Sequence, residues 1–169
     1  EANRIINGAA DWVYEEEFGF DRGFYWSPNG SHIAYYKFDE KQVREFGMDM
    51  YGGLYPDRYT FKYPKAGERN STVGIWVYNV MTEMNQRVNT GTETDIYFPR
   101  IKWGVGSNQL VIMRLNRHQN HLEFLLSDMT KVQPFEIEST VIFSEKADTY
   151  IDVNDALTFL KDGSGFIWN

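Results

Sequence analysis

A short motif occurs three times along this 169-residue chain and limits its fold more than any other feature. In each copy an aromatic residue is followed three residues later by a turn and then by a hydrophobic segment rich in β-branched and aromatic residues. An Asn-Gly or Asp-Gly pair between two such segments favours a β-hairpin, because both central turn residues need positive φ. The copies begin at Trp26, Trp103 and Phe159, and their predicted turns are Asn29-Gly30, Gly106-Ser107 and Asp162-Gly163.

The spacing of the motif predicts an all-β fold that forms part of a β-propeller. A hairpin module recurring about every 40 to 50 residues is typical of propellers, whose blades are four-stranded sheets. Trp103 lies 77 residues after Trp26, and Phe159 lies 56 residues after Trp103, so we expect about two to three blades. The excess in the first interval falls in residues 39–70. The alternative is a sandwich of two sheets, and the helix candidates are brief: Tyr14–Phe18 and Val153–Leu157.

Composition excludes several classes of function. The net charge of −7 argues against nucleic acid as a partner, because such proteins concentrate positive charge. No apolar run approaches the roughly 18 residues that a membrane-spanning helix needs. The absence of cysteine excludes disulfides, a thiolate nucleophile and Cys-ligated zinc. Because the chain starts without methionine and stops inside a predicted strand, we expect it to be a fragment of a larger protein.

The segment DWVYEEEF, Asp11 to Phe18, contains the strongest candidate for a binding site. Three adjacent carboxylates repel one another unless a cation or several N–H donors lie among them. The run is consistent with a solvated loop or helix end, as most charge runs are. A metal site is less compatible, because hard cations favour carboxylates spread around a loop. The third interpretation is a receptor for an organic ammonium group, which offers three donors and no acceptor.

No other combination of residues indicates chemistry. His118 and His121 lie in a polar turn rather than on a helix, and Asp152–Asp155 lacks the glycine and glutamate that a calcium loop needs. No G-x-S-x-G elbow and no glycine-rich phosphate loop are present. We therefore assign no catalytic residue, no metal site and no cofactor within this chain.

Three blocks together resemble the propeller domain of the dipeptidyl peptidase IV family, within the prolyl oligopeptidases. They are DWVYEEEF, YWSPNGSHIAYYKFDE from Tyr25, and FKYPKAGERNSTV from Phe61. An aromatic-SPNG block is generic to propellers, but DWVYEEE is specific. The resemblance implies an eight-bladed propeller that caps an α/β-hydrolase domain, in a serine exopeptidase that removes N-terminal Xaa-Pro or Xaa-Ala dipeptides.

The same resemblance assigns substrate binding to a glutamate pair. In the family a double glutamate binds the free α-amino group of the peptide, which corresponds here to Glu16 and Glu17. Glu15 belongs to the motif but is not assigned the contact. The catalytic Ser, Asp and His of the family lie in the hydrolase domain, which this chain lacks. We therefore expect the chain alone to be inactive.

The resemblance also implies partners and a location. An arm extended from one blade contributes to the family's dimers, and residues 39–63 occupy the matching place, so a homodimer through this arm is expected. Mammalian relatives carry disulfides in this region and this chain has none, which suggests a bacterial protein of the periplasm or cell surface. The alternatives are a tripeptidyl peptidase or an endopeptidase of the same family, and a non-enzymatic propeller that only binds other proteins.

Overall fold

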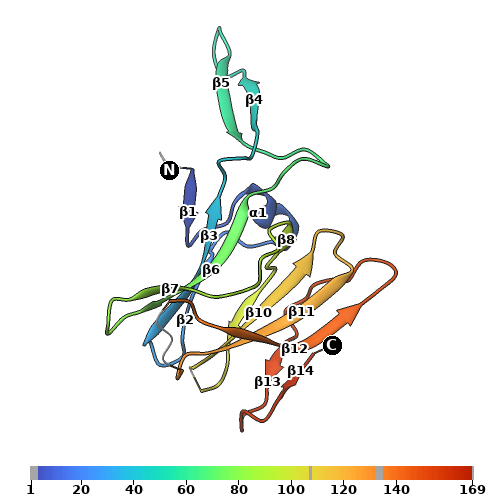
Figure 1. Ribbon diagram of the computed structural model, residues 1–169. Helices are drawn as coiled ribbons and strands as arrows, with labels where there is room; N and C mark the ends of the chain where they lie inside the picture. The colour runs from blue at the N-terminus through green and yellow to red at the C-terminus, as the bar shows by residue number, and fades with distance from the viewer. Residues whose placement is uncertain (1–3, 107, 132–134, 169) are drawn as a thin grey trace.

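A computed structural model describes residues 4–106, 108–131 and 135–168 of the chain, whose regular structure is β-strand apart from one short helix (Figure 1). Ser107, and with it the predicted Gly106-Ser107 turn, lies outside the described residues. The elements are β1 (Ile5–Asn7), α1 (Trp12–Phe18), β2 (Phe24–Trp26), β3 (His32–Asp39), β4 (Glu45–Met50), β5 (Asp57–Lys62), β6 (Thr72–Asn79), β7 (Asn85–Arg87), β8 (Ile96–Tyr97), β9 (Ile101–Trp103), β10 (Gln109–Asn116), β11 (His121–Asp128), β12 (Ser139–Lys146), β13 (Thr158–Phe159) and β14 (Phe166–Ile167).

The strands form two successive antiparallel blades and the start of a third. The first sheet has the order β1-β3-β6-β7, and β2 also pairs with β3. The second has the order β12-β11-β10-β8, and β9 also pairs with β10. The hairpin β13–β14 follows. Each copy of the sequence motif thus places its aromatic residue at the end of the short strand that opens a hairpin, and the prediction of an all-β, partial β-propeller is confirmed.

In both complete blades the edge strand is divided in two. β1 and β2 pair with opposite ends of β3, and β8 and β9 pair with opposite ends of β10. In the first blade the interruption runs from Gly8 to Gly23 and contains α1. The Gly23 N–H donates to the Gly8 carbonyl at 3.0 Å, which closes the neck of this excursion. A Cβ at Gly23 would lie 3.2 Å from the backbone of Ala9, a tight contact that glycine avoids without any shift of that backbone.

The core lies between the two blades and continues under α1. Alternate residues of the long strands point into it, as the period of two in a strand requires. Tyr36 and Phe38 of β3 are fully buried, and so is Ile112 of β10. Phe124 of β11 is also fully buried but on the other face of the second blade, where its ring lies 5.7 Å from that of Phe166 in β14. This shared core fixes the first blade against the second, and therefore fixes the surface that α1 carries relative to the β10–β11 hairpin.

The turns at Asn29-Gly30 and Asp162-Gly163 are present, but their conformation differs from the prediction. The Gly30 N–H donates to the Ser27 carbonyl at 2.9 Å, so Pro28 and Asn29 are the central residues and only Gly30 has positive φ, at 72°. The second turn is built the same way, with Gly163 bonded to Leu160. A positive φ was expected at both central residues, and this expectation is wrong. Proline fixes φ at a negative value that suits the first central position of a common turn, and glycine follows that turn.

One of the two helix candidates is confirmed and the other is wrong. Tyr14–Phe18 lies within α1, whereas Val153–Leu157 is irregular. The side chain of Asn154 accepts from the Ala156 N–H at 2.8 Å, which is a local alternative to helical hydrogen bonding. The Leu157 carbonyl, which a helix would use internally, accepts instead from the Lys102 ammonium group.

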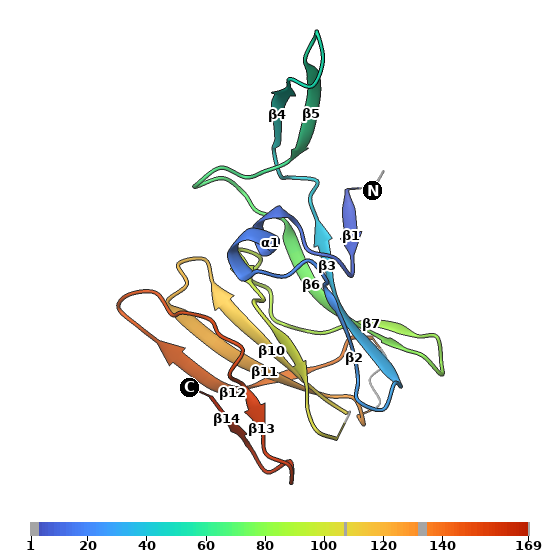
Figure 2. The same cartoon turned by 180° about the vertical axis from the view of Figure 1, so that it is seen from behind.

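A two-stranded hairpin, β4–β5, stands out from the body of the molecule on the side where α1 lies (Figures 1 and 2). Its strands pair in register from Glu45 with Lys62 to Met50 with Asp57. An aromatic contact joins its base to α1, because the rings of Trp12 and Tyr63 lie 4.2 Å apart in an edge-to-face arrangement. The rings of Phe46 and Tyr63 are 5.4 Å apart, so the contact continues into the hairpin.

Candidate functional site

The acidic run folds as the short helix α1 because its first residues supply a cap and its aromatic residues supply a buried face. The Asp11 carboxylate accepts from the Tyr14 N–H at 3.0 Å, which caps the N-terminus. Tyr14 and Phe18 are four residues apart, so they lie on the same face, and both are buried. The helix ends at Gly19, which is left-handed with φ of 68°.

Contacts with both blades hold α1 in place. The Tyr14 hydroxyl accepts from the Phe98 N–H of the second blade at 2.8 Å. The Arg100 guanidinium donates to the Phe18 carbonyl at 2.9 Å and satisfies one of the free carbonyls at the helix end. Asp11 also accepts from the Ser71 hydroxyl at 2.6 Å. The helix is therefore fixed at its start, middle and end.

Burial affects the two titratable anchors of the helix. It raises the pKa of Asp11, and hydrogen bonds from Ser71 and from the helix backbone offset only part of this rise. Burial also raises the pKa of the Tyr14 hydroxyl well above its usual range. Tyr14 therefore stays neutral and serves as a hydrogen-bonding group rather than as an acid or base.

All three glutamates of the run are exposed on α1. Successive helical residues are about 100° apart around the axis, so Glu16 lies opposite the face formed by Tyr14 and Phe18, and Glu15 and Glu17 lie on its two flanks. The helix therefore spreads these carboxylates rather than converging two of them, and Glu16 and Glu17 can share a ligand only if their side chains bend toward it.

Among the described residues, the carboxylates of the run have one neutral partner and no cationic one. The Gln119 side-chain amide, in the β10–β11 turn, donates to Glu17 Oε1 at 2.7 Å. Within the described part of the chain, none of the three glutamates forms an ion pair. The negative charge of this surface is thus not neutralised by an ion pair with any described residue, which suits a cationic ligand. The sequence did not single out Gln119, because only the fold brings it to α1.

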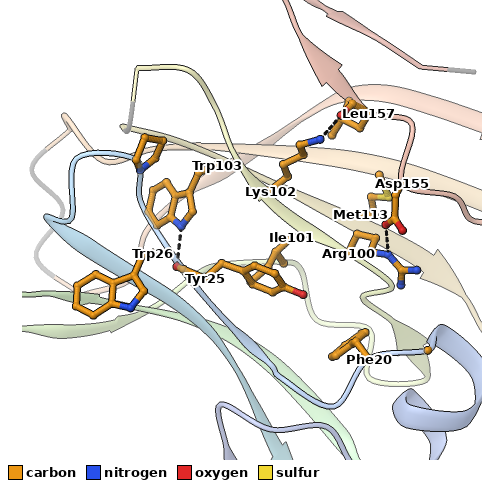
Figure 3. Close-up of a pocket in the computed structure, with 12 residues that line it drawn as sticks. Phe20, Tyr25, Trp26, Arg100, Ile101, Lys102, Trp103, Met113, Asp155 and Leu157 are labelled. Carbon is orange, nitrogen blue, oxygen red and sulfur yellow. Dashed lines mark hydrogen bonds and ion pairs between the residues drawn. The ribbon is translucent and has the colours of Figure 1, made fainter.

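A cavity of about 410 Å³ lies beside the C-terminal end of α1, between edge strands of the blades (Figure 3). Four of its twelve lining residues are aromatic. Two of them are joined by a hydrogen bond, since the Trp103 indole N–H donates to the Tyr25 carbonyl at 2.9 Å. Arg100 pairs with Asp155 at 2.5 Å. None of the three glutamates lines the cavity, so it is separate from the acidic surface. The lining residues are Gly19, Phe20, Tyr25, Trp26, Pro28, Arg100, Ile101, Lys102, Trp103, Met113, Asp155 and Leu157.

Two kinds of feature are absent from the described residues. Over residues 4–106, 108–131 and 135–168, no group of three or more His, Asp or Glu side chains is arranged to hold a metal ion. Within the same ranges, no helix has the length and apolar character needed to cross a membrane.

Two complete blades, the start of a third and a helix inserted into an edge strand define this chain as part of a β-propeller protein. It belongs to the dipeptidyl peptidase IV family: the family model described as "Dipeptidyl peptidase IV (DPP IV) N-terminal region" matches residues 1–169. The resemblance that DWVYEEEF indicated is therefore confirmed at the level of the family.

Individual relatives agree with this assignment. Dipeptidyl aminopeptidase B of Saccharomyces cerevisiae is 34% identical over 133 residues, which are 73% of this chain and 16% of the relative. Inactive dipeptidyl peptidase 10 of Rattus norvegicus is 29% identical over 169 residues, 96% of this chain and 20% of the relative. The crystal structure of Porphyromonas gingivalis dipeptidyl peptidase 4 matches with a TM-score of 0.85 and 38% identity, over 97% of this chain and 23% of that one. The chain thus spans less than a quarter of the length of these relatives.

Proposed function

We propose that this chain is the substrate-gating propeller segment of a serine exopeptidase that removes N-terminal Xaa-Pro or Xaa-Ala dipeptides. In this proposal Glu16 and Glu17 bind the free α-amino group of the peptide. The observation that carries it is an exposed glutamate pair with no cationic partner among the described residues, on a helix fixed to two blades of a dipeptidyl peptidase IV family member.

The energetics support recognition of an ammonium group. A hydrogen bond to a charged group contributes about 1.5–3 kcal/mol, so two such bonds contribute about 3–6 kcal/mol in favour of a charged amino terminus. That is enough for at least a hundredfold discrimination. Fixing the amine also fixes which peptide bond reaches a distant nucleophile, so a rigid α1 would act as a ruler for the length of the released peptide.

The proposal includes a hydrolase domain of the same parent protein as the source of the catalytic Ser, Asp and His. It also includes a homodimer formed through the arm, residues 39–63. The β4–β5 hairpin exposes a group of apolar side chains, and such groups commonly mark protein contacts. The exposed apolar residues of the hairpin and its tip are Met48, Met50, Tyr51, Leu54, Tyr55 and Tyr59.

We further propose a bacterial protein in the periplasm or at the cell surface.

The test compares free and N-acetylated substrates on the full-length protein. Glu16→Gln and Glu17→Gln keep size but remove charge, so each should lower kcat/KM for a free Xaa-Pro substrate by about 2–4 kcal/mol, or roughly 30- to 1000-fold. Glu15→Gln is the matched control and should cost far less. The acetylated substrate has no ammonium group, so it should be poor for the wild type and nearly insensitive to all three changes.

Equal losses on both substrates in Glu16→Gln and Glu17→Gln would show that the pair is structural. The proposal would then fail.

A tripeptidyl peptidase or an endopeptidase would be identified by the length of the released product. A non-enzymatic propeller is a second candidate, because a relative of this chain is named an inactive peptidase. It predicts no G-x-S-x-G motif, followed by Asp and His, in the parent sequence.

A further inference from the structure

The β10–β11 turn holds Gln119 rigidly. Gln119 has φ of 55°, which few residues other than glycine adopt. Its N–H donates to the Asn116 carbonyl at 2.9 Å, and its own carbonyl accepts from the Ile151 N–H at 2.6 Å. The Asn116 side chain in turn accepts from the backbone N–H groups of Asn120 and His121, each at 3.0 Å. Hydrogen bonds at its N–H, at its carbonyl and at the two following N–H groups therefore fix the backbone that carries the Gln119 side chain.

That side chain reaches from the second blade to the helix of the first. Its Nε2 donates to Glu17 Oε1 at 2.7 Å, which is a short distance for an amide donor and typical of a bond to a carboxylate. The bond occupies one carboxylate oxygen and leaves Oε2 for a ligand. Because the amide is neutral, it restrains Glu17 without cancelling its charge. A lysine or arginine at this place would neutralise that charge.

We propose that Gln119 is a positioning residue for amine recognition: it orients Glu17 so that the free oxygen faces the substrate ammonium group. This inference rests on the proposed function. Without the bond, an exposed glutamate side chain samples several rotamers, and each substrate molecule must select the productive one. Gln119 thus provides preorganisation from outside the acidic run and makes the second blade part of the site.

Two substitutions test this role in the full-length protein. Gln119→Asn keeps a residue that tolerates positive φ but is one methylene too short to reach Glu17. Gln119→Glu keeps the length but places a carboxylate against a carboxylate. His118→Ala is the matched control, since His118 is an exposed neighbour in the same turn with no hydrogen bond in the described part of the chain.

We expect Gln119→Asn to lower kcat/KM for a free Xaa-Pro substrate about tenfold, mainly through KM, which corresponds to about 1.4 kcal/mol. Gln119→Glu should lower it further, and His118→Ala should leave it unchanged. The N-acetylated substrate should be affected by none of them. In a double-mutant cycle, Gln119→Asn should add nothing to Glu17→Gln, because the amide acts only through that carboxylate.

Three outcomes separate the claims. If Glu17→Gln impairs only the free substrate while Gln119→Asn and Gln119→Glu behave as wild type, the positioning role is overturned and the proposed function stands. If the Gln119 variants impair both substrates equally, the bond only docks the turn on the helix, and the inference fails. If Glu17→Gln itself does not distinguish the substrates, the proposed function and this inference both fail.

Discussion

Two neighbouring buried tyrosines should respond in opposite directions to the loss of one hydroxyl group. Tyr14 and Tyr36 are 2% and 0% exposed, and their rings are 6.0 Å apart. The Tyr14 hydroxyl accepts from the Phe98 N–H, whereas the Tyr36 hydroxyl has no hydrogen-bond partner in the described part of the chain. Phenylalanine keeps the ring at either site and removes only the hydroxyl.

The magnitudes follow from these two environments. In Tyr14→Phe the buried Phe98 N–H is left unpaired, at a cost of about 1–2 kcal/mol. In Tyr36→Phe a buried polar group that makes no hydrogen bond is removed, which should stabilise the fold by about 1 kcal/mol. Because 1 kcal/mol shifts Tm by about 2–4 °C in a domain of 150–250 residues and by less in a larger protein, we expect a fall of up to about 8 °C for Tyr14→Phe and a rise of up to about 4 °C for Tyr36→Phe.

Thermal unfolding of the full-length protein and both variants measures these shifts, and hydrogen exchange at the Phe98 amide provides a local readout. Tyr14→Phe should accelerate exchange at Phe98, and Tyr36→Phe should not. If both substitutions lower Tm equally, or if exchange at Phe98 is unchanged in Tyr14→Phe, the hydrogen bond does not anchor α1 and the reasoning is wrong.

Two further predictions concern the cap and the arm. Burial raises the pKa of Asp11 above its value in the unfolded chain, so the folded state binds the proton more tightly. The buried carboxylate destabilises the fold while it is charged, and this destabilisation is lost as pH falls through the folded pKa. The stability of the wild type relative to Asp11→Asn should therefore rise as pH is lowered toward about 3, and a pH-independent difference would contradict this. The isolated 169-residue chain should self-associate through residues 39–63, because the arm exposes apolar side chains and unpaired blade edges invite pairing. Replacing the hairpin by a short linker should remove that association, and a monomeric wild type in sedimentation at tens of micromolar would count against it.

Local sequence signals were sufficient to predict the strands. The alternation of apolar and polar residues within a strand, and the turn residues that bound it, each occupy only a few neighbouring positions. They were not sufficient for the segment 153–157. Its composition suits a helix, but its polar groups are used by Arg100 and Lys102, which lie more than fifty residues earlier. Tertiary contacts therefore decided the backbone there.

The candidate site shows the same limit. The motif was enough to select Glu16 and Glu17, and the capping role of Asp11 is visible within four residues of sequence. The partner of Glu17 is 102 positions away and depends on how two blades pack. No pattern around Gln119 indicates that contact, since a glutamine in a polar turn is ordinary. The sequence thus selects the charged groups of the proposed site but not the neutral group that we propose orients one of them.

The divided edge strands have a consequence for how this fold can change. In the second blade the interruption between β8 and β9 is only residues 98–100, whereas in the first it is the excursion between Gly8 and Gly23. Tyr36 of the neighbouring strand bonds to both Gly8 and Gly23, each at 2.9 Å, so the hydrogen-bond ladder is continuous across the neck whatever lies beyond it. An insertion there can be lengthened, shortened or exchanged while the blade keeps its pairing. Selection can thus remodel helix α1, which carries the acidic run, without redesigning the propeller, and the same gap in the second blade is a natural place to graft a new recognition element.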